Sequence, residues 1–276
     1  MVVSMQVIHD KVTVPHQNPR VSRPRLLRVL EEGLDACTST IITGRAGTGK
    51  TLLVKDFAQN CEARTAWYTV EAPDIELRIF LRYLVESVSR QRPGFGREVL
   101  AHFTGSPGFE DIPTLAEAFL YELQECRGEP LLLVIDDLHL IYDAEWVMPF
   151  FRRLLPLLPP EAHLLIIGRS LPPTPVWRMR SKQTLCLIEE ASLAFTPQEA
   201  ADLFAGYGLA ASDARAALEQ TQGRAAALDG LARRMSGMMS GGVTTWGDTP
   251  QPKPRATHRC AFQTINPFMK DGVGKG

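Results

Sequence analysis

Residues 44–51 of the chain read Gly-Arg-Ala-Gly-Thr-Gly-Lys-Thr and follow the pattern G-x-x-x-x-G-K-[ST]. They lie between the short β-branched segment 39–43, which predicts a strand, and the segment 52–58, which predicts a helix. Glycines in such a turn let successive backbone N–H groups point at one anion, and the N-terminus of the following helix adds its positive dipole. The stretch therefore predicts a loop that binds phosphate groups.

The phosphates of a nucleotide are the predicted ligand of this loop. Lys50 would place its ammonium group against the β- and γ-phosphates, and Thr51 would offer its hydroxyl to Mg²⁺. A chance match is the alternative, and average residue frequencies produce one on the order of once per hundred chains of this length. The residues expected to contact the nucleotide here are Gly44, Arg45, Ala46, Gly47, Thr48, Gly49, Lys50, Thr51 and Leu52.

Two adjacent acids, Asp136 and Asp137, follow the apolar run 131–135, which is typical of a strand buried on both faces. Carboxylates at the end of a parallel strand lie where ligands of such sheets bind. We therefore expect Asp136 to hold Mg²⁺, directly or through water, and Asp137 to orient or deprotonate an attacking water. The alternative is that both acids merely end a strand and cap the next helix.

Arg169 follows the next buried run, 163–167, and is predicted to reach the γ-phosphate from the neighbouring strand. A solvent-facing arginine at a strand end is the alternative. Trp67 and Tyr68 are expected in the core rather than against adenine, and His139 is expected to be a hydrogen-bonded residue rather than a ligand.

Short apolar segments alternate with longer amphipathic ones, which predicts an α/β fold with a doubly wound, parallel, five-stranded sheet. The predicted strands are 39–43, 65–70, 131–135, 163–167 and 185–188. The separation between Thr51 and Asp136 leaves room for one strand and two helices, so another strand is expected between the loop strand and the acidic strand. That order is typical of the additional-strand class of P-loop NTPases. The absence of an N-K-x-D sequence favours adenine over guanine.

Capping residues predict where several helices begin. Asp74 is expected to cap one helix, and the pair Thr114 and Glu117 to form a capping box at another. Residues 93–112 are expected to be a loop broken by a short helix. Beyond residue 193 the pattern becomes helical only: Thr196-Pro197-Gln198-Glu199 predicts a helix start, and the stretches 212–222 and 224–236 predict two more helices. The predicted organisation is an N-terminal segment (1–20), a P-loop ATPase domain (21–192), a small helical appendage (193–236) and a disordered tail (237–276).

The composition of the chain argues against several classes of function. The 276 residues are 45% hydrophobic, and 30 basic against 31 acidic side chains leave a formal net charge of -1. No global basic field would attract nucleic acid or an anionic membrane. The 5 cysteines are widely spaced, which favours neither disulfides nor a zinc site. No apolar run approaches the roughly 20 residues of a membrane helix. These features are typical of a cytoplasmic protein.

The order of these motifs resembles the N-terminal ATPase domain of MalT-like, LuxR-type transcriptional regulators of the STAND class. Outside the loop at 44–51, the segments that carry the resemblance are 11–15, 21–27, 66–70, 136–141, 168–173 and 195–200. The resemblance covers about residues 11–235. It implies an ATP-dependent switch that self-associates with ATP and inducer and is reset by slow hydrolysis.

The resemblance also implies which residues form the site. It places the segment with Val21 and Arg23 near the adenine, and it supports Lys50, Asp137 and Arg169 as catalytic and Thr51 and Asp136 as metal-binding. At two places the sequence departs from the family's pattern. Thr48 stands where the family usually has an aromatic residue. Residues 223–228 lack the tryptophan of a G-W-x-A-G-L type segment.

The family's winged-helix, sensor and DNA-binding regions have no counterpart in this sequence. We therefore expect a truncated regulator without direct DNA binding. Two other functions stay open, a nucleotide-binding interaction module without turnover and a ring-forming AAA-like ATPase.

Overall fold

The computed structural model describes residues 7–104, 111–126, 128–174 and 176–239. The predicted disordered tail begins at residue 237, but residues 237–239 are helical, so the prediction is wrong there; from residue 240 onward the segment lies outside the described residues. Within the described ranges no helix combines the length and apolar character that crossing a membrane would require.

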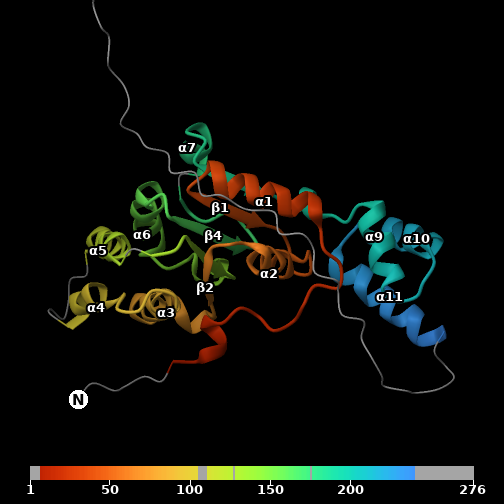
Figure 1. The fold of residues 1–276 in the computed structure, drawn as a ribbon, viewed down its shortest axis with the longest axis horizontal. Helices are drawn as coiled ribbons and strands as arrows, with labels where there is room; N and C mark the ends of the chain where they lie inside the picture. Colours follow the sequence, from red (N-terminus) through yellow and green to blue (C-terminus); the bar gives the residue numbers. More distant parts are fainter. Residues whose placement is uncertain (1–6, 105–110, 127, 175, 240–276) are drawn as a thin grey trace, which may run out of the picture.

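Five parallel strands form one sheet in the order β2-β3-β4-β1-β5 (Figure 1). Their bounds are β1 (Ser39–Thr43), β2 (Arg64–Thr69), β3 (Leu131–Asp136), β4 (Ala162–Gly168) and β5 (Leu185–Ile188). Strand β4 lies between β1, which leads into the glycine-rich loop, and β3, which carries the acids. The predicted additional strand is therefore present, and the predicted fold class is confirmed.

Alternate residues of each strand divide between two apolar layers, because successive side chains of a strand point to opposite faces. Leu131, Leu133 and Ile135 pack in one cluster. Leu132 and Val134 pack in the other. All six residues of β3 are buried, which explains its unbroken apolar run. The sheet is covered on both faces, as the doubly wound prediction requires.

Helices α1 (Pro24–Ala36) and α2 (Lys50–Asn60) close one face of the sheet. Helices α3 (Leu77–Ser89), α4 (Arg97–Thr104), α5 (Ile112–Glu125) and α6 (Val147–Leu154) contribute to the cluster on the other face, and α7 (Val176–Ser181) packs beside β5. Short 3-10 turns η1 (His9–Val12), η2 (Ala72–Ile75), η3 (Leu138–Ile141) and η4 (Leu155–Leu157) lie between these elements.

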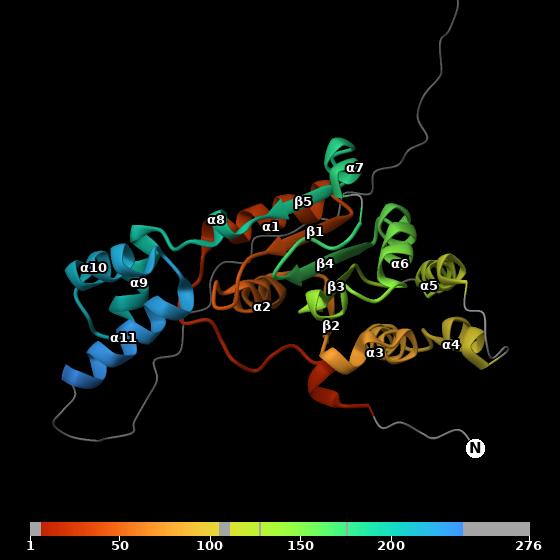
Figure 2. The same ribbon diagram turned by 180° about the vertical axis from the view of Figure 1, so that it is seen from behind.

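The chain continues from β5 through α8 (Glu190–Leu193) into a group of three helices with its own apolar cluster. They are α9 (Pro197–Ala205), α10 (Ala211–Thr221) and α11 (Ala225–Met239), and we call them the appendage. The capping box at the start of α9 forms as expected: the Thr196 hydroxyl accepts from the Glu199 N–H, and the Thr196 N–H donates to the Glu199 carboxylate. Figure 2 shows the appendage beyond α2, on the side of the molecule away from α4 and α5.

One predicted helix cap is wrong: Asp74 does not cap α3, and its carboxylate accepts from the Glu71 N–H at the start of η2 and pairs with Lys11. Asp74 lies inside η2 and not at a helix start, and both its carboxylate oxygens are 2.6 Å from the Lys11 ammonium. Helix α3 begins only at Leu77. The side chain of Asp74 thus combines a local bond within η2 with a buried ion pair to Lys11, which local sequence does not reveal.

The predicted capping box at Thr114 and Glu117 is also wrong. Helix α5 begins earlier, at Ile112, and its N-cap position is Asp111. The Thr114 hydroxyl donates to the Asp111 carboxylate, and Glu117 pairs with Arg153 of α6. The proline at 113 is compatible with the first turn of a helix, which allows the earlier start.

Candidate nucleotide-binding site

The glycine-rich loop connects β1 to α2 and takes a backbone path that its glycines permit. Gly47 and Gly49 have φ angles of 79° and 84°, in the left-handed region that side chains disfavour. Lys50 begins α2 and is buried, and its ammonium donates to the carbonyl oxygens of Gly44 (2.5 Å) and Arg45 (2.9 Å). The loop therefore curls around the lysine side chain.

Thr51 and Asp136 meet beside this loop. The Thr51 hydroxyl donates to the Asp136 carboxylate at 2.9 Å. The other carboxylate oxygen accepts from the backbone N–H of Asp137 at 2.9 Å. Burial raises the pKa of Asp136 to about 7, and the neighbouring charge of Asp137 acts in the same direction. A nearby cation would favour the charged form of such a carboxylate.

Asp137 turns the chain out of β3 with a positive φ of 57°, and its side chain is 45% exposed. The Nδ1 atom of His139 lies 3.6 Å from an Asp137 oxygen. Neither ring nitrogen of His139 has a hydrogen-bond partner, although both atoms are buried. The expectation of a hydrogen-bonded His139 is therefore wrong. Burial lowers the pKa of His139, so its neutral form is favoured.

Arg169 follows β4 and is exposed at the end of the sheet where the glycine-rich loop and Asp136 also lie. Its charge contributes to lowering the pKa values of Lys50 and His139, so it lies within electrostatic reach of both. Burial is the largest cause of the lowered Lys50 pKa, and the charges of Asp137 and Asp136 oppose it. The residues predicted from three separate strand ends thus gather around the loop.

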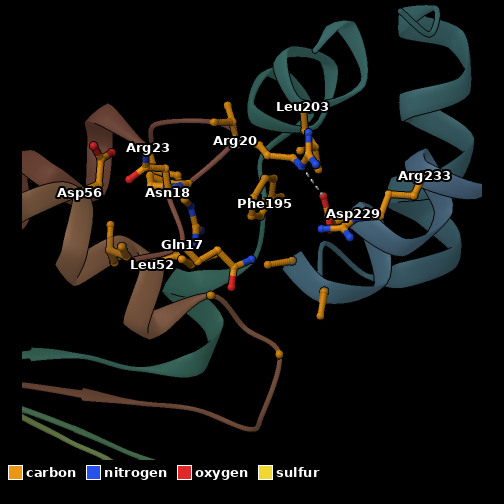
Figure 3. Close-up of a pocket in the computed structure, with 17 residues that line it drawn as sticks. Gln17, Asn18, Arg20, Arg23, Leu52, Asp56, Phe195, Leu203, Asp229 and Arg233 are labelled. Atoms are coloured by element: carbon orange, nitrogen blue, oxygen red, sulfur yellow. Dashed lines mark hydrogen bonds and ion pairs between the residues drawn. The ribbon is translucent and has the colours of Figure 1, made fainter. Parts of the chain in front are cut away.

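A cavity of about 230 Å³ opens between the loop, the segment that precedes α1, and the appendage (Figure 3). Val21, Arg23 and Leu52, which the sequence placed near the nucleotide, line it. Its walls also include residues that sequence reasoning missed: Gln17, Asn18, Arg20, Asp56, Phe195, Leu203, Asp229 and Arg233. No local motif marks these residues, because they meet only when the appendage packs beside the loop.

Arg23 is the buried cation of this cavity. Its guanidinium lies 4.6 Å from the centre of the Phe195 ring, and its Nη2 donates to the Leu193 carbonyl at 2.6 Å. Its Nε and Nη1 atoms are buried without a hydrogen-bond partner, although Nε lies 3.7 Å from a carboxylate oxygen of Glu199, and burial lowers the guanidinium pKa to about 10. Unsatisfied buried donors are costly, so they fit a ligand that brings acceptor atoms.

Glu190 of α8 is a further contact of the loop that the sequence did not indicate. Its carboxylate accepts from the backbone N–H of Arg45 at 2.8 Å and from the Arg45 side chain at 2.6 Å.

Within the described residues, no group of three or more His, Cys, Asp or Glu side chains could hold a metal ion. One hydroxyl and one carboxylate fit Mg²⁺, which commonly takes its remaining ligands from phosphates and water.

The fold and the arrangement of this site define a P-loop ATPase module. The chain belongs to the AAA ATPase domain family, whose family model matches residues 23–167. Family membership implies that the module binds nucleotide.

Among individual proteins, the chain is similar to the HTH-type transcriptional regulator MalT. It is 31% identical to the protein of Cronobacter sakazakii over 188 residues, which are 67% of this chain and 20% of that one. It is 32% identical to the protein of Yersinia enterocolitica over 186 residues, again 67% and 20%. The chain thus spans about a fifth of the length of these relatives. The predicted resemblance to a MalT-like ATPase domain is confirmed.

A solved structure supports the fold. The crystal structure of a STAND protein with a tetratricopeptide repeat sensor, from Pyrococcus horikoshii, matches with a TM-score of 0.51 at 15% identity. The match covers 78% of this chain and 30% of that chain. At this identity the likeness concerns the fold alone.

Proposed function

We propose that this chain is the switch module of a MalT-like transcriptional regulator, which binds ATP with Mg²⁺ and hydrolyses the ATP slowly. The observation that carries the proposal is the 2.9 Å hydrogen bond between Thr51 and Asp136 beside the glycine-rich loop. It joins a hydroxyl and a carboxylate, two oxygen donors that suit Mg²⁺ next to phosphate groups.

In this proposal the loop at 44–51 holds the phosphates through its backbone N–H groups and the charge of Lys50. Val21, Arg23 and Leu52 hold the adenosine part, because they line the cavity that adjoins the loop. The Nη1 group of Arg23, which makes no hydrogen bond to the protein, donates to an acceptor atom of the nucleotide. The donor set therefore suits an anionic, acceptor-rich ligand.

Hydrolysis in this proposal depends on residues at the ends of β3 and β4. Thr51 and Asp136 would hold Mg²⁺, which when bound would neutralise charge on the phosphates. Asp137 orients the attacking water and accepts its proton. Arg169 stabilises negative charge at the γ-phosphate.

Coupling to the rest of a regulator is proposed through the appendage. Residues 21–192 would form the ATPase domain and residues 193–236 the helical part, and both contribute walls to one cavity. Exchange of ATP for ADP would therefore change contacts in both the ATPase domain and the helical part. We propose self-association in the ATP state, a cytoplasmic location, and no direct DNA contact, since the net charge of -1 provides no basic field.

Isothermal titration of the full chain with ATP and Mg²⁺, and with ADP, tests binding. Lys50→Ala should weaken both affinities by about 100-fold, because the loop loses its charge-assisted contact with phosphate. Lys182→Ala is the matched control, since Lys182 is exposed just before β5, at the opposite end of the sheet from the loop. Wild-type affinity in Lys50→Ala would exclude the loop as the phosphate site.

Turnover distinguishes a switch from a module that binds nucleotide without hydrolysing it. A slow phosphate release that Asp137→Asn abolishes would support the switch. Tight nucleotide binding with no release, in wild type and variant alike, would support the passive module. Size-exclusion chromatography with a non-hydrolysable ATP analogue would detect a ring, which would support the third alternative.

A further inference from the structure

The start of α11 contacts the middle of the glycine-rich loop directly. The guanidinium of Arg224 donates to the Ala46 carbonyl from Nη2 (2.6 Å) and Nε (3.2 Å). The backbone N–H of Ala226 donates to the Gly47 carbonyl at 2.9 Å. A methyl group on Gly47 would come within 2.9 Å of the Ala226 Cβ, so the two segments are in close contact.

These bonds fix the orientation of two peptide groups of the loop. In a trans peptide the C=O and the N–H point in opposite directions, and the described residues include no cis bond. When the carbonyls of Ala46 and Gly47 are held toward α11, the N–H groups of Gly47 and Thr48 turn away from it. A phosphate-binding loop needs successive N–H groups that converge on one anion.

The loop is held from a second side by Glu190, which accepts from the Arg45 N–H. Residues 45, 46 and 47 are thus each held by a segment that follows the sheet in the chain. Glycine-rich loops lose much conformational entropy when they are ordered, so such external bonds favour a single loop conformation. Arg224 supplies the side-chain part of this restraint from the appendage.

Arg224 stands where the related G-W-x-A-G-L type segment has a tryptophan. Its side chain is exposed, and it contacts the loop through hydrogen bonds to the Ala46 carbonyl. Because it bonds a carbonyl of the loop, its effect on a ligand passes through the loop backbone.

We propose that Arg224 is a positioning residue that aims the backbone N–H groups of Gly47 and Thr48 at the nucleotide phosphates. The inference rests on the proposed nucleotide binding and adds to it a link between the appendage and the phosphate site. Arg224 acts on the phosphate part of the ligand, since it does not line the cavity proposed for the adenosine part, although its neighbours Ala225 and Ala226 do.

The test compares ligands with and without phosphates, using the full chain and the variants Arg224→Ala and Arg224→Lys. ADP affinity is measured by isothermal titration, and adenosine affinity by competition with ADP at millimolar concentrations. Arg224→Ala should raise the Kd for ADP about tenfold and leave the Kd for adenosine within about twofold of wild type. Arg224→Lys should recover most of the ADP affinity, because an ammonium also donates to the Ala46 carbonyl.

Arg215→Ala is the matched control, since Arg215 is an exposed arginine on α10 of the same appendage. It should bind both ligands as wild type does. Equal loss of ADP and adenosine affinity in Arg224→Ala would indicate general disruption of the appendage and would overturn the positioning role. Wild-type ADP affinity in Arg224→Ala, or an Arg224→Lys variant as weak as Arg224→Ala, would overturn it as well.

The failure of the proposed function has a different signature. If the wild type binds neither ligand, or if Lys50→Ala binds ADP as the wild type does, the proposal of nucleotide binding at this loop is wrong. The proposed role of Arg224 is then wrong as well. If Lys50→Ala loses ADP and Arg224→Ala does not, only the role of Arg224 is wrong.

Discussion

The hydroxyl of Thr51 donates a 2.9 Å hydrogen bond to the carboxylate of Asp136, 85 positions further along the chain. The contact depends on the strand order, since β4 separates the strand before Thr51 from the strand that ends at Asp136. Helix α2 spans this gap by carrying Thr51 in its first turn. The pair therefore reports both the topology of the sheet and the position of the candidate metal site.

Thr51→Ala should remove most of the gain in ATP affinity that Mg²⁺ provides. We expect this gain to fall about tenfold, because one oxygen ligand is lost and the partner of Asp136 is removed. The measurement is titration with ATP in Mg²⁺ and in EDTA. Thr51→Ser keeps the hydroxyl and should behave as wild type. An unchanged Mg²⁺ dependence in Thr51→Ala would contradict the assignment.

Asp137→Asn should lower ATP turnover about 100-fold or more, because an amide cannot accept a proton from water. Its ADP affinity should stay within about threefold of wild type, since no binding contact is proposed for this side chain. Phosphate release under single-turnover conditions measures the first quantity. Asp143→Asn, at an exposed acid in the segment after η3, is the control. Equal turnover in both variants would remove Asp137 from the mechanism.

His163 should make the stability of the fold depend on pH below 6.5. It is buried in β4, with Nδ1 3.1 Å from the Cys37 carbonyl and Nε2 2.8 Å from the Thr40 hydroxyl. The carbonyl can only accept, so Nδ1 carries the proton and Nε2 accepts from Thr40. Burial lowers the pKa of His163 from 6.5 to about 4.

Between these two pH values the unfolded chain binds a proton at His163 that the folded chain does not. The contribution of neutral His163 to the free energy of unfolding is therefore fully present above pH 6.5. It declines as the pH falls toward 4, by about 3 kcal/mol in total. His163→Gln should be less stable at pH 8 but should lose less stability on acidification. Urea unfolding at several pH values measures this difference. His16→Gln, at an exposed histidine, should keep the wild-type slope, and a wild-type slope in His163→Gln would disprove the prediction.

Glu199→Ala should loosen the appendage and weaken nucleotide binding together. The buried Glu199 carboxylate accepts from the Thr196 N–H and from Arg25, and it lies 3.7 Å from the Nε atom of Arg23. Removing it leaves the charge of Arg23 buried without its acid, which costs about 3–5 kcal/mol of stability. Hydrogen exchange of α9–α11 and ADP titration measure the two effects. Glu219→Ala, at an exposed position of α10, should change neither, and unaltered exchange in Glu199→Ala would refute the coupling.

Much of the fold could be predicted because its determinants are local. The unbroken apolar runs of β3 and β4 indicate strands buried on both faces, and the structure buries them so. Trp67 and Tyr68 are core residues as expected. Capping signals were less reliable: Thr196 caps its helix, whereas Asp74 lies inside the turn η2 and pairs with Lys11. A side chain that suits a cap also suits an ion pair, and local sequence does not distinguish them.

The amino-acid sequence alone determined the strands, the glycine-rich loop and the acids after β3, because periodicity and motif spacing are properties of neighbouring residues. Only the tertiary structure decided which distant groups meet that loop. Glu190 reaches Arg45, and Arg224 reaches Ala46, through the packing of elements that follow the sheet. Such contacts depend on how the appendage docks, and docking is set by the shapes of whole apolar faces rather than by a pattern in any one segment.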